Sequence, residues 1–308
     1  MQGRVPNIAV IGSLNMDVVI TAARPPRMGE TVMGEEIHFL PGGKGANQAA
    51  ACARLGADCA MIGAVGQDAF GSELVQSLKD KGVHTESISV VPGVSTGTAS
   101  ILLSQGDNCI VVVPGANSRC LPEDIERHRE RIAQADIVLL QLEIPLETVV
   151  YAARLAKQSG CRVVLNPAPV PENGLPTELL ESVDYITPNR SELGLLTGMD
   201  TEQDALEAAM ERLAGMGPAH VVTTLGADGA AYKAPGAPVI RAAGHRVQVV
   251  DTTGAGDAFN AGLACSLASG GTLAEAVAFA LKVSALAVTK LGAQTGMPTL
   301  AEVRSFGG

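Results

Sequence analysis

The residues best suited to chemistry lie at 251–257, where two threonines, two glycines and an alanine separate two aspartates. Glycines let the backbone turn tightly and approach a ligand closely. An apolar helical run begins at Ala255, so the amides of Gly254, Ala255 and Gly256 are expected at a helix N-terminus, which attracts anions. Beside such a site the Asp257 carboxylate is suited to take a hydroxyl proton in phosphoryl transfer, while the amides stabilise the transferred charge.

The same segment also has a purely structural interpretation. A glycine-rich turn can precede a helix that carries Asp257 as an acid in its first turn, with no ligand involved. The run at 246–250 (RVQVV) is strand-like and predicts a strand that leads into this turn. Polar residues elsewhere in the chain decide between the two interpretations.

Asn15 and Asp17 follow an apolar, strand-like run at 7–14. Because they alternate along an extended chain, both can face one ligand. An amide that donates and accepts, next to a carboxylate that accepts, suits a polyol. Either residue alone is also typical of an Asx turn.

A second glycine-rich segment, GGKGANQ, spans 42–48. Gly43 permits close approach to a ligand, and Lys44 and Asn47 supply polar contacts near a helix start. A Walker-type phosphate loop is the alternative, but its spacing G-x-x-x-x-G-K-[ST] is absent. Glu143 follows another strand-like run, where α/β sheets present residues to ligands, although a surface glutamate is the alternative.

Two later segments are ordinary on their residues alone. Asn189 and Glu192 predict a helix cap with an acid in the first turn. The segment TLGADG at 224–229 leaves a strand through two glycines and predicts a turn.

Taken together, these segments resemble the ribokinase/phosphofructokinase-B family of carbohydrate kinases. Residues 251–257 resemble its C-terminal signature and 42–48 its N-terminal glycine-rich signature. The similarity extends over essentially the whole chain, in the family's order, through 12–17, 141–143, 166–168, 187–192 and 224–226. The resemblance implies ATP-dependent phosphorylation of D-ribose at its 5-hydroxyl, with Asp257 as general base and the amides of Gly254, Ala255 and Gly256 as an anion hole.

The resemblance also implies a set of ligand-binding residues. Those implied for the sugar are Asn15, Asp17, Gly43, Lys44, Asn47, Glu143 and Asp257. Those implied for ATP are Asn189, Thr224, Leu225, Gly226, Ala227, Asp228, Gly229 and Gly256. The motif at 189–192 is associated with Mg²⁺, and because that ion retains waters, Glu192 is expected to act through them.

The family's monovalent-cation site, which implies K⁺, falls on six positions of this chain: Asp251, Thr253, Ala287, Lys290, Gly292 and Gly296. The first two offer side chains, and the others offer backbone carbonyls. The family usually has Ser where this chain has Gly296, so only a carbonyl is left there. A cation at this place would fix the loop that forms the anion hole.

Composition excludes several classes of protein. The chain has 308 residues, 46% of them hydrophobic and 18% charged, which predicts a sizeable packed core. Its formal net charge of −10, without a run of Lys or Arg, argues against nucleic-acid binding. No apolar stretch has the length of a membrane span or a signal peptide. Six scattered cysteines without a C-x-x-C pair are typical of reduced thiols and favour a cytoplasmic protein.

Strand-like and helix-like runs alternate, which predicts an α/β fold: a three-layer α/β/α core with a mainly parallel central sheet. Strands are predicted at 7–14, 60–65, 137–141, 162–166 and 221–224. Helices are predicted at 45–55, 70–81, 146–158, 201–214, 255–268 and 273–290.

Two stretches, 15–42 and 95–118, break this alternation and predict a small β-sheet lid. The second contains a hairpin signature, with runs at 97–103 and 109–113 around a turn-rich 104–108. The core would then comprise 1–14, 43–94 and 119–308. Since exposed lid strands need covering, the lid is also expected to pair with a second copy in a homodimer.

The acceptor remains open among related molecules. D-ribose, 2-deoxyribose, another sugar and a nucleoside all suit the fold. A non-catalytic sensor of a sugar or nucleotide is the alternative from another class, but it would not need to retain Asp257 and the glycines at 254 and 256.

Overall fold

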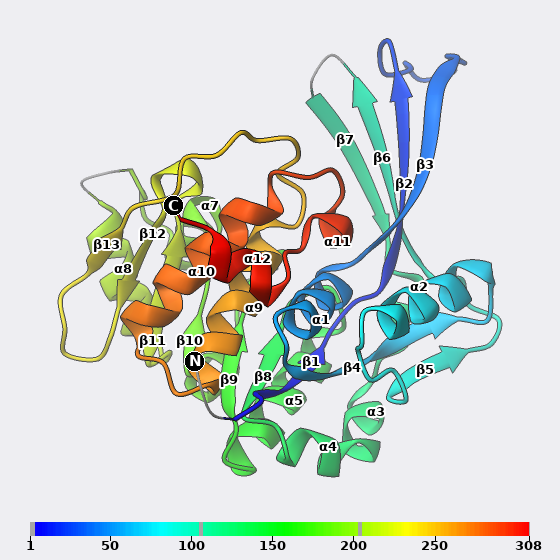
Figure 1. The fold of residues 1–308 in the computed structure, drawn as a ribbon. Helices are drawn as coiled ribbons and strands as arrows, with labels where there is room; N and C mark the ends of the chain where they lie inside the picture. The colour runs from blue at the N-terminus through cyan, green and yellow to red at the C-terminus, as the bar shows by residue number, and fades with distance from the viewer. Residues whose placement is uncertain (1–3, 105–106, 203–204, 308) are drawn as a thin grey trace.

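A computed structural model describes residues 4–104, 107–202 and 205–307. Its core is a nine-stranded sheet in the order β13-β12-β11-β10-β9-β8-β1-β4-β5 (Figure 1). The strands from β11 to β5 in this order are parallel, whereas β11-β12 and β12-β13 are antiparallel. Their bounds are β1 Asn7–Ile11, β4 Asp58–Gly66, β5 Ile88–Val91, β8 Ile137–Leu140, β9 Arg162–Leu165, β10 Tyr185–Ile186, β11 His220–Thr224, β12 Ala230–Lys233 and β13 Ile240–Ala242.

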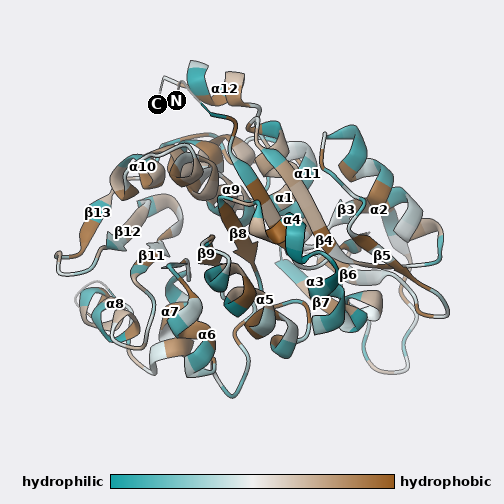
Figure 2. Ribbon diagram, turned by 90° about the horizontal axis from the view of Figure 1, so that it is seen from below, coloured by the Kyte–Doolittle hydropathy of each residue, from teal (hydrophilic) through white to brown (hydrophobic). Residues whose placement is uncertain are grey.

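Helices cover both faces of this sheet, and Figure 2 shows the apolar strands between two helical layers. The first layer comprises α1 Lys44–Arg54, α2 Ala69–Asp80, α9 Ala255–Ala268 and α10 Leu273–Ala287. The second comprises α3 Pro122–Arg127, α4 Arg129–Ala133, α5 Leu146–Gln158, α6 Thr177–Ser182, α7 Arg190–Thr197 and α8 Leu206–Ala214. Short helices α11 Ala293–Gly296 and α12 Leu300–Ser305 end the described chain.

Strand β1 shows why three layers form. Its side chains alternate between the two cores: Ile8 and Val10 pack into one, Ala9 and Ile11 into the other. A parallel strand covered on both faces reads as a nearly continuous apolar run, and β1 is apolar and buried from Ile8 to Ile11. The α/β class and the three-layer arrangement predicted from the sequence are confirmed.

The small sheet is separate from the core and has the order β3-β2-β6-β7. It consists of β2 Asn15–Ala22, β3 Gly34–Gly42, β6 Gly97–Ser104 and β7 Asp107–Val113. It projects from the core at the upper right of Figure 1. The predicted hairpin is present, since β6 and β7 pair antiparallel, while residues 105–106 of its turn lie outside the described residues.

Some predicted elements are wrong or misplaced. Residues 246–250 form no strand, because no neighbouring strand pairs with them; Val250 only donates its amide to the Val288 carbonyl. The predicted helix at 201–214 begins at Leu206, and residues 203–204 lie outside the described residues. The helix predicted to reach residue 290 ends at Ala287. Across the described residues, no helix is long and apolar enough to cross a membrane.

Candidate active site

The Asp257 carboxylate lies in the first turn of α9 and is 6% exposed. The side-chain amide of Asn47 donates to its Oδ2 at 2.9 Å, and that of Gln48 donates to its Oδ1 at 3.1 Å. Both donors lie near the N-terminus of α1, which packs against α9. The carboxylate is therefore held in one orientation, and each oxygen keeps a free lone pair.

The ionisation of Asp257 is set by opposing effects. Burial raises its pKa above the ordinary aspartate value. The positive charge of Lys44 and the hydrogen bonds from Asn47 and Gln48 lower it, while the negative charge of Glu143 raises it. A carboxyl with a raised pKa is a stronger proton acceptor, as a general base requires.

A cavity of about 210 Å³ opens at the N-terminus of α9, beside Asp257. Its walls are mainly polar and comprise Lys44, Asn166, Ala168, Thr187, Asn189, Glu192, Thr224, Thr252, Gly254, Ala255, Gly256, Asp257 and Asn260. Within the described chain no hydrogen bond engages the amides of Gly254 and Gly256, so both can bind an anion. The Ala255 amide donates to the Thr252 carbonyl at 3.2 Å in this structure, so its part in the anion hole stays a prediction.

A second cavity, of about 340 Å³, lies between the small sheet and the core. Asn15, Asn117, Ser118 and Glu143 are its polar residues, and Val112 of β7 belongs to its apolar wall. Asn117 donates to the Asn15 side-chain oxygen at 2.7 Å and so fixes the orientation of that amide. No motif in the sequence points to Asn117, which belongs to a short helical turn, η1 Gly115–Arg119.

The Glu143 carboxylate is positioned by the loop after β1 and by the start of α1. Its Oε2 accepts from the Ser13 hydroxyl at 2.5 Å and from the Lys44 amide at 3.1 Å. Gly43 makes this approach possible: its φ is +89°, and a Cβ there would lie 2.7 Å from the Asn15 amide nitrogen. The hydrogen bond between Lys44 and Glu143 therefore joins the walls of the two cavities.

Asp17 belongs to the same group of charges. Burial, together with the negative charges of Glu143 and Asp257, raises its pKa to about 7, against the lowering effect of Lys44. Asn15 and Asp17 both lie at the start of β2, where the small sheet meets the core.

Lys44 is the cation of this group and lines the cavity beside Asp257. Burial lowers its pKa, but the surrounding carboxylates, Asp257 and Glu143 foremost, raise it above the ordinary lysine value. The side chain therefore remains charged next to the anion hole, where it can neutralise a phosphate as well as contact a sugar.

Asn189 and Glu192 form the predicted capping box of α7. The Asn189 side chain accepts from the Glu192 amide, and the Glu192 carboxylate accepts from the Asn189 amide, both at 2.8 Å. Burial raises the pKa of Glu192. Among the described residues no three His, Cys, Asp or Glu side chains converge on a metal position. Glu192 at the cavity wall fits an ion held mainly by phosphates and water.

The segment 224–229 is divided between different surroundings. Thr224, at the end of β11, lines the cavity with Asn189. Leu225 packs into the core, and Asp228 faces Arg190 on the surface at 3.5 Å. Within this segment, only Thr224 is among the residues of the cavity wall.

Asp251 ties the loop before α9 to the loop before α11. Its Oδ1 accepts from the Thr253 amide at 2.9 Å and its Oδ2 from the Gly292 amide at 2.8 Å. Burial raises its pKa, but these hydrogen bonds outweigh that effect and hold the pKa below the ordinary value. A charged carboxylate at this place suits a cation.

Gly296 leaves room where a side chain would otherwise lie. A Cβ at this position would be 2.6 Å from the Ala287 carbonyl oxygen and 3.6 Å from that of Lys290. Two carbonyl oxygens therefore border the space that the absent side chain leaves, and carbonyl oxygens are donors that suit K⁺. A serine in this backbone would require the Ala287 carbonyl to shift.

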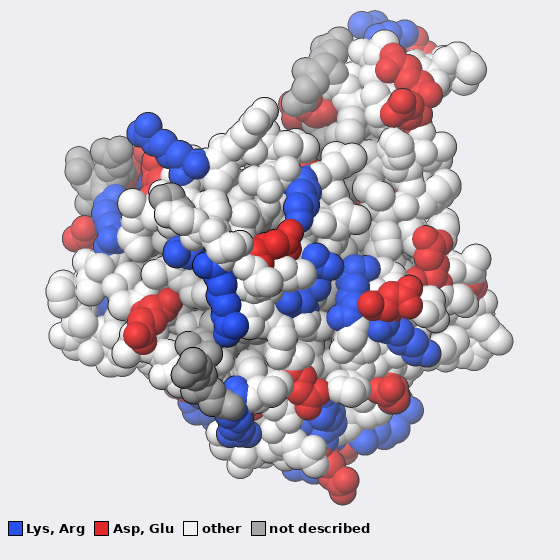
Figure 3. Space-filling model, viewed as in Figure 1, with Lys and Arg blue, Asp and Glu red and all other residues white. Residues whose placement is uncertain are grey.

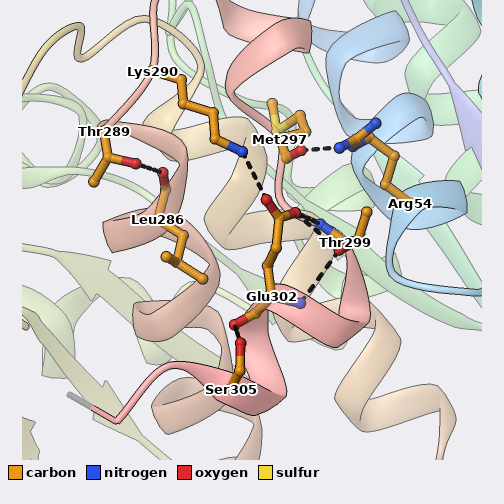
Figure 4. Close-up of polar contacts among 8 residues, drawn as sticks. All are labelled: Arg54, Leu286, Thr289, Lys290, Met297, Thr299, Glu302 and Ser305. Carbon is orange, nitrogen blue, oxygen red and sulfur yellow. Dashed lines mark hydrogen bonds and ion pairs between the residues drawn. The ribbon is translucent and has the colours of Figure 1, made fainter.

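Figure 4 shows how this loop is fastened to its neighbours. Lys290 pairs with Glu302 at 2.8 Å, and Glu302 caps α12 through Thr299. Arg54, at the end of α1, donates to the Met297 carbonyl at 2.6 Å. The loops at 287–297 are thus anchored both to α12 and to the helix that carries Asn47.

On the face shown in Figure 3, acidic and basic side chains are interspersed.

Three comparisons place the chain among known proteins. A family model described as pfkB family carbohydrate kinase matches residues 5–300. Ribokinase of Bacillus subtilis (strain 168) is 42% identical over 300 residues, which cover 97% of this chain and 99% of that protein. Deoxyribokinase of Salmonella typhi is 35% identical over 302 residues, which cover 97% and 98%. The structure of Arabidopsis thaliana ribokinase complexed with ribose and ATP is similar with a TM-score of 0.92 at 36% identity, covering 98% of each chain.

Proposed function

The chain belongs to the pfkB family of carbohydrate kinases, and on that premise we propose that it transfers the γ-phosphate of ATP to the 5-hydroxyl of D-ribose. The products are ribose 5-phosphate and ADP. One observation carries the proposal: Asp257 lies buried and oriented beside two amides at the N-terminus of α9, in the wall of a polar cavity. The similarity to ribokinases over nearly the full chain supports ribose as the acceptor.

In the proposed reaction Asp257 takes the proton of the sugar hydroxyl as its oxygen bonds to the γ-phosphorus. The bond from the γ-phosphorus to the bridging oxygen breaks, and ADP leaves with that electron pair. The amides of Gly254 and Gly256, with the Lys44 ammonium, stabilise the negative charge on the transferred group. Asn15, Asp17, Gly43, Asn47 and Glu143 bind the sugar, with Asn47 also holding Asp257.

We assign the nucleotide to the cavity beside α9, with Asn189, Thr224 and Gly256 in contact with it. The turn at 225–229 lies next to Thr224 and is assigned to the outer part of the nucleotide. Mg²⁺, when bound, neutralises phosphate charge, and Glu192 would hold it through water. K⁺, when bound by Asp251, Thr253 and the carbonyls of 287, 290, 292 and 296, would fix the loop before α9 in place.

The four-stranded sheet is proposed to act as a lid, and residues 15–42 and 95–118 as the segment that moves. Val112 of β7 already borders the cavity that contains Asn15 and Glu143. Closure would exclude water, which otherwise competes with the sugar for the phosphoryl group.

The exposed apolar side chains of β7 favour a homodimer in which two lids cover each other. Ile110, Val111, Val112 and Val113 are each at least half exposed. Light scattering should give twice the mass of the chain, and Ile110→Asp should give a monomer. A monomeric wild-type protein would contradict this part of the proposal. A cytoplasmic location rests on the cysteines alone and remains a prediction.

The experiment that tests the function is an ADP-release assay with D-ribose, 2-deoxyribose, other pentoses and hexoses, and nucleosides as acceptors. We expect the highest kcat/KM with D-ribose. Preference for 2-deoxyribose would favour the alternative that the deoxyribokinase similarity supports. Binding of sugar without ADP release would indicate a sensor and overturn the proposed activity.

A further inference from the structure

Gln48 is fully buried, although its side chain is a polar amide. It is the fifth residue of α1, and its Nε2 donates to Asp257 Oδ1 at 3.1 Å and to the Asn166 side-chain oxygen at 3.2 Å. Its Oε1 accepts from Gln141 Nε2 at 2.6 Å. All hydrogen-bonding capacity of the Gln48 amide except one lone pair is therefore used inside the protein.

The direction of this amide is fixed from both ends. A carboxylate only accepts hydrogen bonds, so the nitrogen end of Gln48 must face Asp257. Its oxygen end must then face a donor. The side-chain amide of Gln141, the residue that follows β8, supplies that donor. A flipped Gln48 would place an oxygen against the carboxylate and would leave a donor of Gln141 facing a donor.

Gln141 is itself fully buried and held in a space that only glycine leaves at position 12. A Cβ on Gly12 would lie 1.9 Å from Gln141 Oε1. That oxygen has no hydrogen-bond partner among the described residues. Leaving a buried oxygen unpaired is costly, and the cost indicates that the donor end of Gln141 is required where it is.

We infer that Gln48 is a positioning residue for Asp257 and that Gln141 acts through it, by fixing the direction of the Gln48 amide. The inference rests on the proposed role of Asp257 as general base. The Gln48 hydrogen bond orients the base carboxylate at Oδ1 and favours its ionised form, as that of Asn47 does at Oδ2. Among the described residues Gln141 makes no hydrogen bond to the carboxylate and does not line the cavity, so its hydrogen bond to Gln48 is its connection to the base.

The pH profile distinguishes this role from simple packing. Removing the Gln48 donor makes the charged carboxylate less stable, which raises the pKa of Asp257 further. The charged groups that also face this carboxylate are Lys44 from α1, Glu143 after β8, Asp17 from β2 and Glu192 from α7. The pH dependence of kcat at saturating sugar and ATP reports the titration of Asp257. The charge of Asp17 acts on sugar binding and therefore on KM, so it does not move this profile.

The test compares Gln48→Met with the wild type by kcat between pH 5 and 9 with ATP and ribose. Methionine keeps the volume and removes the donor. We expect the acid limb to move upward by about one to two pH units, the range for a hydrogen bond to a charged group. The KM for ATP should change less than about twofold. If this variant does not fold, Gln48→Glu tests the same point, because a second carboxyl beside Asp257 also moves the acid limb upward.

Gln141→Met should move the acid limb in the same direction by a smaller amount, and it should add nothing to Gln48→Met in the double variant. Thr148→Val is the matched control. The buried hydroxyl of Thr148, in α5, donates to the Cys120 carbonyl, so its loss should lower Tm without moving the acid limb.

A uniform fall of kcat at every pH, or an unchanged limb in both Gln48 variants, would overturn the inference. If the acid-limb shifts of Gln141→Met and Gln48→Met add in the double variant, Gln141 does not act through Gln48. A wild type without activity on ribose, but with the same variant pattern on another acceptor, would instead contradict only the proposed substrate.

Discussion

The Asn47 side chain donates to Asp257 Oδ2 at 2.9 Å across a sequence separation of 210 residues. This hydrogen bond joins the two glycine-rich segments that the sequence singles out, one at the start of α1 and one at the start of α9. It also places a residue expected to bind sugar directly on the proposed base. The two segments therefore form one site, in which loss of either partner affects the other.

Asp257→Asn should reduce kcat by roughly 10²-fold or more, because general-base catalysis has this magnitude. Asparagine keeps the shape, so calorimetry should give ribose and ATP affinities within a few-fold of the wild type. Asp80→Asn, which changes an exposed aspartate on α2, serves as the control. Near-normal turnover of Asp257→Asn would contradict the assignment of the base.

Asp17→Asn should raise the ribose KM by about 10-fold or more with little change in the ATP KM, since it removes a charged hydrogen-bond acceptor. The pKa of Asp17 is about 7, so the wild-type carboxylate gains a proton as the pH falls through that value. The wild-type ribose KM should accordingly rise between pH 8 and pH 6, and that of Asp17→Asn should stay flat. An equal effect on both substrates would count against a sugar role.

The raised pKa of Asp17 also predicts how the free energy of unfolding depends on pH. Folded Asp17 binds its proton more tightly than unfolded Asp17, so its contribution to stability is intact below the unfolded value of 3.8 and is lost as the pH rises to about 7. Asp17→Asn should therefore increase the free energy of unfolding at pH 8, by up to about 4 kcal/mol, and leave it nearly unchanged near pH 4. Urea titrations at both pH values measure this. If Asp17→Asn changes the free energy of unfolding equally at pH 8 and pH 4, the raised pKa of Asp17 is contradicted.

Potassium should activate the enzyme relative to sodium or no added salt, because the carbonyls around Gly296 and the Asp251 carboxylate offer oxygen donors. Gly296→Ala should remove most of this activation, since a Cβ would lie 2.6 Å from the Ala287 carbonyl. Initial rates across KCl and NaCl concentrations measure the effect. Gly307→Ala is the control, because a Cβ there meets nothing within 4 Å. Rates that do not depend on the cation would rule out the site.

Glu192→Gln should raise the Mg²⁺ concentration needed for half-maximal rate by about 10-fold, within the range for ligands that act through an outer shell. Glutamine can still accept from the Asn189 amide, so the cap of α7 and the Tm should be retained. An unchanged Mg²⁺ requirement would remove Glu192 from metal binding.

Much of the fold could be predicted because its signals are local. The helix at 45–55 was expected from alanine-rich periodicity and is found at Lys44–Arg54, and the helix at 255–268 coincides with α9. The run at 246–250 predicts a strand that the structure lacks, because an alternation of apolar residues forms a strand only where a partner strand is present. The two-residue strand β10 was missed, since so short a run carries no period.

The sequence by itself determined the class of fold, the family and the residue types of the site, because glycine-rich turns, apolar periods and motif order are all local features. Only the tertiary structure decided how those residues serve one another. Gln48 belongs to the glycine-rich segment 42–48, but the motif assigns it no role. Its hydrogen bond to Asp257 forms because the fold brings α1, α9 and the end of β8 together. Whether the Ala255 amide is free, and whether Gly296 leaves room for an ion, likewise depend on atoms brought together by packing. Hydrogen bonds and steric contacts act over a few ångströms, so the residues that fix the direction of a side chain are set by folding and not by their order in the chain.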